Sequence, residues 1–162
     1  QGGEDKLMTR GEKIITLLST GFYTGYFPFA PATFSTLTLG IPCYVLMCRL
    51  NPYLYALTTF TLYFLAVWLS DKSETIFKKK DASFIVIDEL VGFLITMFLV
   101  PLSWVTVVLG FFLFRFFDIV KPPPANIFNN RKKGGLDVVL DDVIAGIYSC
   151  IVLHLIHTFV LS

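Results

Sequence analysis

The stretch from Leu90 to Phe114, LVGFLITMFLVPLSWVTVVLGFFLF, contains no charged side chain. A helix that crosses the hydrocarbon core of a bilayer needs about 20 mostly apolar residues, so this stretch is typical of a membrane protein. It can be read as one tilted helix, or as two helices that meet at Val100-Pro101-Leu102-Ser103. The two-helix interpretation extends the first helix back to Asp88 and Glu89 and the second forward to Arg115.

The composition of the whole chain agrees with a membrane location. Of the 162 residues, 55% are hydrophobic and only 15% are charged, and the mean hydropathy is +0.71. Soluble domains carry about 25% charged residues, so this chain has too few polar side chains to cover a soluble surface. These values exclude intrinsic disorder, a nucleic-acid-binding module that depends on net charge, and most soluble enzyme folds.

Three other uncharged runs predict further membrane-spanning helices. Leu50–Ser70 and Val143–Ser162 each have the length of one span, whereas Ile14–Cys48 is longer and is interrupted by Pro28 and Pro31. We therefore expect the first span to begin near Thr33 and to end near Cys48. With two helices between Leu90 and Phe114, the chain would cross the membrane about five times.

The distribution of basic residues distinguishes five spans from four. With five spans, the successive loops hold 3, 1, 4, 0, 4 and 0 lysine or arginine residues, from Lys6 to the C-terminus. This alternation follows the positive-inside rule, whereas four spans would place the basic segment from Lys121 to Lys133 outside. We therefore predict an all-α membrane bundle with a cytoplasmic N-terminus. All twelve acidic residues then lie on the cytoplasmic side, so any chemistry is predicted to occur at the cytoplasmic face of the membrane.

The N-terminal segment predicts a short helix in the membrane interface. Thr9 and Glu12 fit a capping box, and apolar residues follow from Ile14. The chain is expected to form a single domain, in which residues 1–20 are the polar N-terminus and interfacial helix and residues 21–162 are the bundle.

Asp88 and Glu89 are acidic residues with apolar neighbours on both sides. A carboxylate at mid-membrane costs at least about 2.5–3.5 kcal/mol, so such groups are usually paired, metal-bound or functional. A structural ion pair with Arg115 is one interpretation, and a ligand site is the other. Adjacent positions of a helix point about 100° apart, so the two carboxylates need not have the same role.

More charged residues lie at the same predicted depth. Arg115, Asp118 and Lys121 share a helix face, so they form either a salt-bridge ladder or part of a site. Asp141 and Asp142 lie where the last span is expected to begin, and there they could simply cap a helix. Lys132 and Lys133 could hold either anionic headgroups or substrate. The Gly/Pro-rich stretch 21–36, which contains Thr33, could contact phosphate through its backbone amides and hydroxyl groups.

Oxygen ligands with nearby cations indicate a particular chemistry. Carboxylates suit Mg²⁺, Ca²⁺ or Mn²⁺ rather than zinc, and cations beside such a metal suggest a phosphate-bearing substrate. Two other functions are consistent with parts of this pattern: a transporter that uses Asp88 and Glu89 as an ion site, and a structural subunit that binds anionic lipid.

Four ordered blocks resemble the phosphatidylglycerophosphatase A family. They are the Gly/Pro segment from Gly21 to Thr36, FIVIDELVG at 84–92, LFRFFDIVKP at 113–122 and GGLDVVLDDVIAG at 134–146. The resemblance implies a Mg²⁺-dependent phosphatase of the bacterial inner membrane, which would convert phosphatidylglycerophosphate to phosphatidylglycerol and phosphate. The lipid is then the partner; the sequence predicts no nucleic-acid partner and leaves the oligomeric state open.

The resemblance also implies roles for single residues. Metal ligands would be Glu89, Asp118, Asp141 and Asp142, with help from Asp88. The phosphate would be contacted by basic residues and one hydroxyl: Arg115, Lys121, Lys132, Lys133 and Thr33. The nucleophile would be a water activated by Mg²⁺, or else Asp118 or Asp141 through an aspartyl-phosphate intermediate. The chain departs from the family pattern by having Ala32 and Ser35 at usual glycines, Ala82 at a usual proline and Asp137 at a common glycine.

Overall fold

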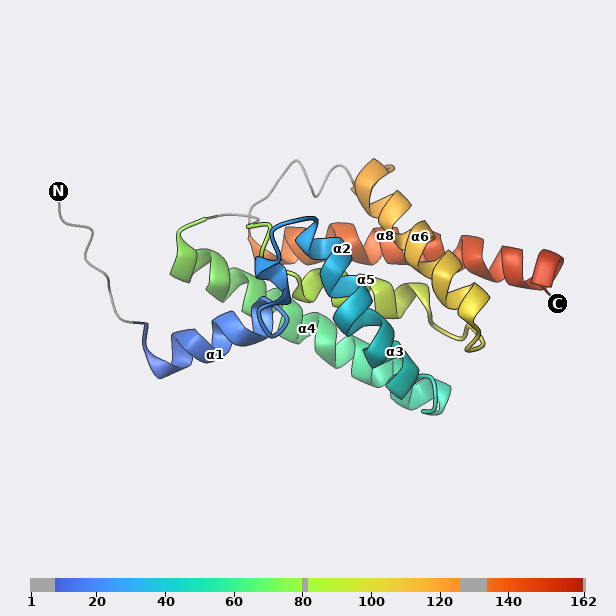
Figure 1. The fold of residues 1–162 in the computed structure, drawn as a ribbon, viewed down its shortest axis with the longest axis horizontal. Coiled ribbons are helices and arrows are strands. Elements are labelled where there is room, and N and C mark those ends of the chain that lie inside the picture. The colour runs from blue at the N-terminus through green and yellow to red at the C-terminus, as the bar shows by residue number, and fades with distance from the viewer. Residues whose placement is uncertain (1–7, 80–81, 126–133, 162) are drawn as a thin grey trace.

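The computed structural model describes residues 8–79, 82–125 and 134–161, and every regular element in these ranges is helical. This confirms the predicted all-α class. In chain order the elements are α1 (Arg10–Ser19), η1 (Thr24–Tyr26), α2 (Pro31–Ser35), η2 (Thr36–Gly40), α3 (Ile41–Met47), α4 (Pro52–Phe77), α5 (Ile87–Thr96), α6 (Trp104–Val120), α8 (Gly135–Ile156) and η3 (His157–Leu161). In Figure 1, α4 and α8 run antiparallel along the long axis, and α5 packs against both.

The uncharged stretch that begins at Leu90 contains two helices, as the two-helix interpretation requires. Helix α5 ends at Thr96, and α6 begins at Trp104 after a capping box formed by Ser103. Asp88 and Glu89 lie in the first turn of α5. The helix break therefore places these two acidic residues at one end of a short helix.

The carbonyl groups near the end of α5 are satisfied by side chains from other helices. The hydroxyl of Tyr55 donates to the carbonyl of Leu94 at 2.7 Å, and that of Tyr44 donates to Val100 at 2.8 Å. Irregular backbone at membrane depth is tolerated only where protein groups satisfy it, because no water is present. These bonds explain how α5 can end inside the bundle.

Helix α8 begins earlier than the hydropathy of the sequence predicts. Its first residue is Gly135 rather than Val143, so Asp141 and Asp142 lie beyond the first turn and do not cap the helix. Gly135 packs against α4 so closely that an added Cβ would lie 2.5 Å from the backbone of Val67 and Asp71. The interpretation of Asp141 and Asp142 as capping residues is therefore wrong.

The N-terminal helix has the predicted cap. The Thr9 amide donates to Glu12 at 2.7 Å, and the Glu12 amide donates back to the Thr9 hydroxyl at 3.3 Å. Helix α1 packs against α4 and buries Thr16 and Ser19. The capping-box prediction is confirmed, whereas the interfacial position of α1 stays a prediction.

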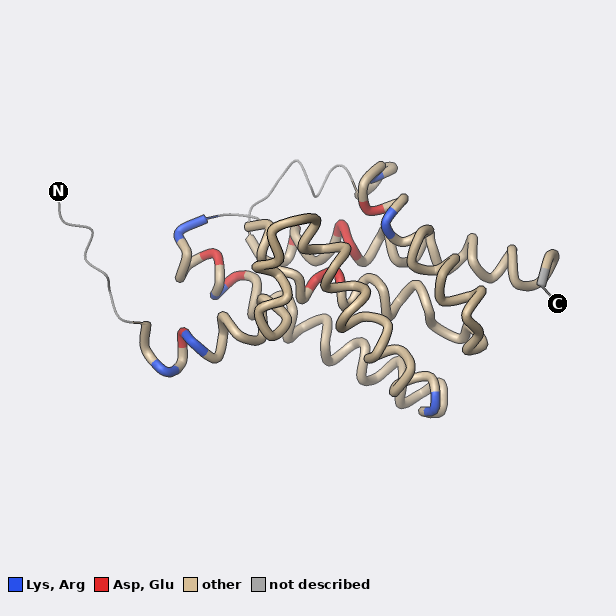
Figure 2. Tube along the Cα trace, in the orientation of Figure 1, with Lys and Arg blue, Asp and Glu red and all other residues tan. Residues whose placement is uncertain are grey.

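Among the described residues, two helices are long and apolar enough to cross a membrane, namely Pro52–Phe77 and the segment Gly135–Val160. The apolar helix Pro31–Met47 is shorter, and α6 has 17 residues. Five spans and a cytoplasmic N-terminus stay predictions. Figure 2 shows most charged residues around the end of the bundle that contains the end of α4 and the beginning of α8, which we call the charged end. Arg49 lies between α3 and α4, at the other end of α4.

Candidate active site

Three buried carboxylates from two helices converge near the charged end. Asp88 and Glu89 come from α5 and Asp142 comes from α8, and each offers an oxygen within 4.8 Å of the others. Their exposed fractions are only 6%, 9% and 4%. Asp88 Oδ1 and Glu89 Oε2 have no hydrogen-bond partner in the described part of the chain. A buried, unpartnered carboxylate oxygen is costly, so this acidic cluster is expected to bind a cation.

Close packing between α5 and α8 brings these carboxylates together. Gly92 lies one helical turn after Glu89, and an added Cβ there would be 2.8 Å from the carbonyl oxygen of Asp142. Gly146 of α8 fits equally closely against the carbonyl of Gly92. Only glycine permits this approach, so these two residues set the distance between the acidic residues of the two helices.

An ion pair from α6 lies beside the acidic cluster. Arg115 Nη1 is 2.8 Å from Asp118 Oδ2, and both residues interact electrostatically with Glu89. Asp118 also lies close to Asp142. Arg115 keeps a buried N–H group at Nε that has no hydrogen-bond partner among the described residues. It can therefore donate to an anion without giving up its contact with Asp118.

The second basic residue of the predicted ladder leaves α6. Lys121 follows the helix in a left-handed conformation, with a φ of 46°, and its ammonium group pairs with Asp141 of α8. Burial lowers the pKa of Lys121, but the hydrogen bond and charge of Asp141 outweigh it and leave this pKa above its ordinary value. Lys121 therefore stays protonated at neutral pH and connects α6 to α8. The ladder on one helix face is wrong for Lys121, although Arg115 and Asp118 do pair.

The site carries more acidic than basic groups. Its acidic cluster and two ion pairs contain five carboxylates and two cations, which gives a formal charge of −3 when all are ionised: Asp88, Glu89, Asp118, Asp141, Asp142, Arg115 and Lys121. Such an excess of buried negative charge has to be neutralised, either by cations or by protonation of some of the carboxylates. A hard divalent ion fits this all-oxygen donor set.

Comparison with known proteins identifies the family. The model of the family described as phosphatidylglycerophosphatase A matches residues 17–157. The chain belongs to the phosphatidylglycerophosphatase A family. A Haemophilus influenzae protein of that name is 35% identical over 148 residues, which is 91% of each chain. The Escherichia coli phosphatidylglycerophosphatase A is 34% identical over 141 residues, covering 86% of this chain and 81% of its own.

A third relative has a different name. A Bacteroides thetaiotaomicron protein, provisionally named a phosphatidylinositol-3-phosphatase, is 38% identical over 157 residues, covering 90% of this chain and 95% of its own. No solved structure matches the chain significantly. Membership of the phosphatidylglycerophosphatase A family confirms the resemblance stated from the sequence blocks, and it confirms that the protein is a phosphatase. The transporter alternative is not favoured.

Several residues that the family resemblance implicates lie outside the acidic cluster. Thr33 is in α2, at the beginning of the apolar helix Pro31–Met47, and is partly buried. This helix packs against α5, where Gly40 lies close to the ring of Phe93. Lys132 and Lys133 lie outside the described residues. Their roles in phosphate binding stay predictions.

The structure groups the residues of this phosphatase differently from the sequence interpretation. Asp88 and Glu89 share one cluster with Asp142, although adjacent positions of a helix diverge. Asp141, expected to bind metal, pairs with Lys121, and its role as a metal ligand stays a prediction. No sequence signal connected these two, because 20 residues and a change of helix separate them.

Proposed function

We propose that this protein is a Mg²⁺-dependent phosphatase that hydrolyses phosphatidylglycerophosphate to phosphatidylglycerol and inorganic phosphate. One observation carries the proposal. A buried acidic cluster, in which one oxygen each of Asp88 and Glu89 has no hydrogen-bond partner among the described residues, lies beside a guanidinium whose Nε–H group also has none. The carboxylates suit a divalent cation, and the guanidinium suits a phosphate. Two relatives named phosphatidylglycerophosphatase A support this choice of substrate.

The acidic residues of the site would bind the metal ion, and the basic residue would bind the phosphate. Asp88, Glu89 and Asp142 would hold Mg²⁺, with Asp118 beside them. The bound ion would supply Lewis acidity, which neutralises phosphate charge. Arg115 would donate its Nε–H group to a phosphate oxygen, and this bond would strengthen as charge develops during the reaction.

Hydrolysis transfers the phosphoryl group from the lipid to water. The P–O bond to the glycerol headgroup breaks, a P–O bond to water forms, and the leaving alkoxide receives a proton. A carboxylate of the cluster would accept the proton of the attacking water. Direct attack by Asp118 or Asp141 would instead give an aspartyl phosphate that water then hydrolyses. Acid-quench trapping of radioactive phosphate on the protein separates the two routes.

An inositol phospholipid is the second candidate substrate. The Bacteroides relative named for such a lipid covers nearly the whole chain, and Asp137 adds a carboxylate where the family commonly has glycine. The hydrolytic chemistry is the same for both lipids, so only the headgroup contacts would differ. Phosphate release from each lipid by the purified protein decides between them.

The catalytic assay should compare four conditions. Purified protein in detergent micelles would receive phosphatidylglycerophosphate or phosphatidylinositol 3-phosphate, each with Mg²⁺ or with a chelator. We expect rapid phosphate release from phosphatidylglycerophosphate only with Mg²⁺, and recovery when Mg²⁺ is restored after chelation. No release from this lipid with Mg²⁺ present would contradict the proposal.

We also infer that the protein crosses the bacterial inner membrane about five times, with the charged end at the cytoplasmic face. The alternation of basic residues along the chain supports this orientation. The uncharged C-terminal half of α8 and the long apolar helices support membrane insertion. Labelling of single introduced cysteines by a membrane-impermeant thiol reagent would test it. A cysteine at Leu102 should react from outside, and one at Ser83 only after permeabilisation.

A further inference from the structure

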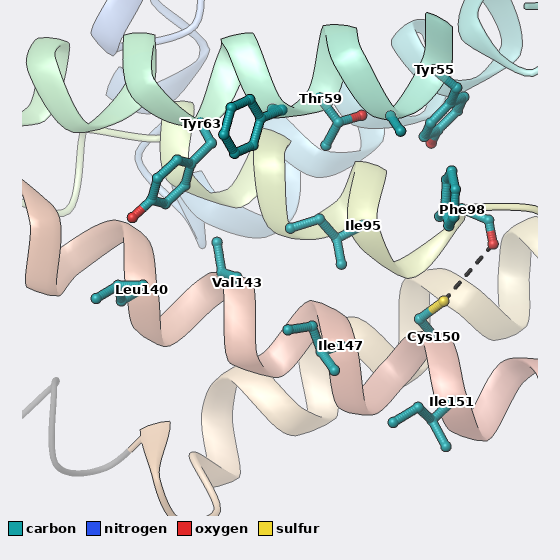
Figure 3. Close-up of a pocket in the computed structure, with 12 residues that line it drawn as sticks. Tyr55, Thr59, Tyr63, Ile95, Phe98, Leu140, Val143, Ile147, Cys150 and Ile151 are labelled. Carbon is teal, nitrogen blue, oxygen red and sulfur yellow. Dashed lines mark hydrogen bonds between the residues drawn. The ribbon is translucent and has the colours of Figure 1, made fainter. Parts of the chain in front are cut away.

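Helices α4 and α8 enclose an apolar groove on the side of α8 away from the acidic cluster. The two helices touch where Gly135 meets α4, and they diverge toward the opposite end of the bundle (Figure 3). The space between them has a volume of about 500 Å³. Tyr55, Thr59 and Tyr63 line one wall, Ile147 and Ile151 line the other, and α5 forms the floor.

The length and width of the groove indicate which kind of molecule it can bind. Its lining extends along α8 from Leu140 to Ile151, which at 1.5 Å per residue corresponds to about 16 Å. Dividing the volume by this length gives a mean cross-section of roughly 30 Å² for the centres of water-sized atoms. With the radius of water added on each side, the slot is about 8 Å wide. A helix with side chains is about 10–12 Å in diameter and does not fit. A hydrocarbon chain, one carbon contact distance or about 4 Å wide, does fit.

The chemistry of the lining agrees with a hydrocarbon occupant. The hydroxyl of Tyr55 and the thiol of Cys150 are already bound to carbonyls of the α5 segment, at Leu94 and Phe98. The buried hydroxyl of Thr59 has no partner among the described residues, but a χ1 rotation can direct it to the carbonyl four residues earlier. The groove therefore presents mainly side-chain carbon.

The position of the groove separates it from a lipid bound at the acidic cluster. Leu140 and Val143 line the groove, whereas Asp142, between them in sequence, faces α5 on another side of α8. The contact between Gly92 and Asp142 closes the passage between α5 and α8. The contact of Gly135 with α4 closes the charged end of the groove. A chain attached to a headgroup in the cluster would have to cross α8 to enter.

We propose that this groove binds one acyl chain of a bilayer phospholipid that is not the substrate. Its length of about 16 Å is close to half of the ~30 Å hydrocarbon core, so one leaflet can supply the chain. The bound chain fills the space between α4 and α8 and supports the angle at which α8 carries Asp142. This inference rests on the membrane placement proposed above and is independent of which phosphate ester the enzyme hydrolyses.

Groove-filling substitutions test the inference directly. Ala56 lines the groove on α4, so Ala56→Trp should fill it, whereas Leu57→Trp adds the same side chain at a neighbouring position that is 60% exposed and outside the lining. Native mass spectrometry of protein in detergent with added phosphatidylethanolamine would count bound lipids. We expect one retained lipid in the unmodified protein and in Leu57→Trp, and at least a tenfold lower occupancy in Ala56→Trp. Equal occupancy in all three proteins would overturn the proposal.

Cys150 provides a second measurement that requires no substitution in the groove. With Cys43 and Cys48 replaced by alanine, an apolar maleimide should label Cys150 several-fold more slowly after phosphatidylethanolamine is added to delipidated protein. An unchanged labelling rate would overturn the proposal. Neither measurement depends on phosphate release, so their failure is distinguishable from failure of the proposed phosphatase function.

Substrate kinetics separate the two possible sources of the chain. In Ala56→Trp, the ratio of KM values for long-chain and short-chain phosphatidylglycerophosphate should equal that of the unmodified protein. A rise in KM confined to the long-chain substrate would show that the groove holds the substrate's own chain, and it would overturn the assignment to a bilayer lipid.

Discussion

Replacing Gly92 with alanine should separate the two halves of the acidic cluster. The added Cβ would lie 2.8 Å from the carbonyl oxygen of Asp142 and 2.6 Å from a ring carbon of Phe114. Carbon–oxygen contacts in proteins begin at about 3.3 Å, so the backbone of α8 must move by about 0.5 Å at Asp142. Asp142 would then move away from Glu89, which is fixed in the same helix as the new methyl group.

The size of the effect follows from this displacement. A misplacement of about 1 Å in a catalytic site costs about 10²-fold in rate, so half that distance should cost about tenfold, or about 1.4 kcal/mol. Alanine improves intrinsic helix stability by about 1 kcal/mol over glycine, which offsets part of the overpacking cost. We therefore expect kcat/KM to fall more clearly than the melting temperature, and the Mg²⁺ concentration for half-maximal activity to rise.

Two other glycines serve as controls for this experiment. Gly110 of α6 packs against Met97 away from the cluster, so Gly110→Ala should change stability without changing the Mg²⁺ requirement. Gly11 of α1 has nothing within 4 Å of an added Cβ, so Gly11→Ala should leave the Mg²⁺ requirement unchanged and raise stability by no more than the helix-propensity gain of about 1 kcal/mol. Phosphate release would be measured over a Mg²⁺ titration for all variants. Full activity and an unchanged Mg²⁺ titration for Gly92→Ala would refute the argument that glycine packing sets the geometry of the site.

Three further predictions concern single interactions. Asp142→Asn removes a charge from the acidic cluster, so phosphate release should fall at least about 10²-fold at 1 mM Mg²⁺ (roughly typical of a lost metal-site group) and recover partly at higher Mg²⁺. Lys121→Met leaves Asp141 buried without its ammonium partner. Because the lysine is partly exposed, the free energy of unfolding should fall by about 1–3 kcal/mol. In a thermal melt, adding Asp141→Leu should restore the melting temperature. Tyr55→Phe leaves the carbonyl of Leu94 without its donor and should lower stability by about 1–3 kcal/mol in the same assay, with the Mg²⁺ titration unchanged.

Much of the fold could be predicted from the sequence because membrane helices have strong local signals. The break in the stretch from Leu90 to Phe114 followed from Pro101 and from the alternation of basic residues along the chain. The start of α8 could not be found in this way. Hydropathy places a span where charges end, but Gly135 allows the helix to begin earlier, against α4.

The site was predictable as a group of residues but not as a set of pairs. The acidic residues were identified because carboxylates among apolar neighbours are costly, which is a local property of the sequence. Which carboxylate faces a cation depends on helix packing. Lys121 leaves the face of Arg115 because α6 ends in a left-handed residue, and only that turn brings it to Asp141.

Helix α8 connects the candidate site to the proposed lipid groove, because its two sides have different environments. One side carries Asp141 and Asp142 toward α5 and α6, and another side, with Ile147, borders the groove. Glycine contacts fix α8 at its beginning and against α5, whereas beside the groove α8 and α4 are separated along a length of about 16 Å and pack less closely. A site that requires sub-ångström positions cannot depend on a helix that is free to tilt on one side. An acyl chain in the groove would remove that freedom, so the two proposals together predict that removal of lipid lowers the rate of phosphate release before it unfolds the protein.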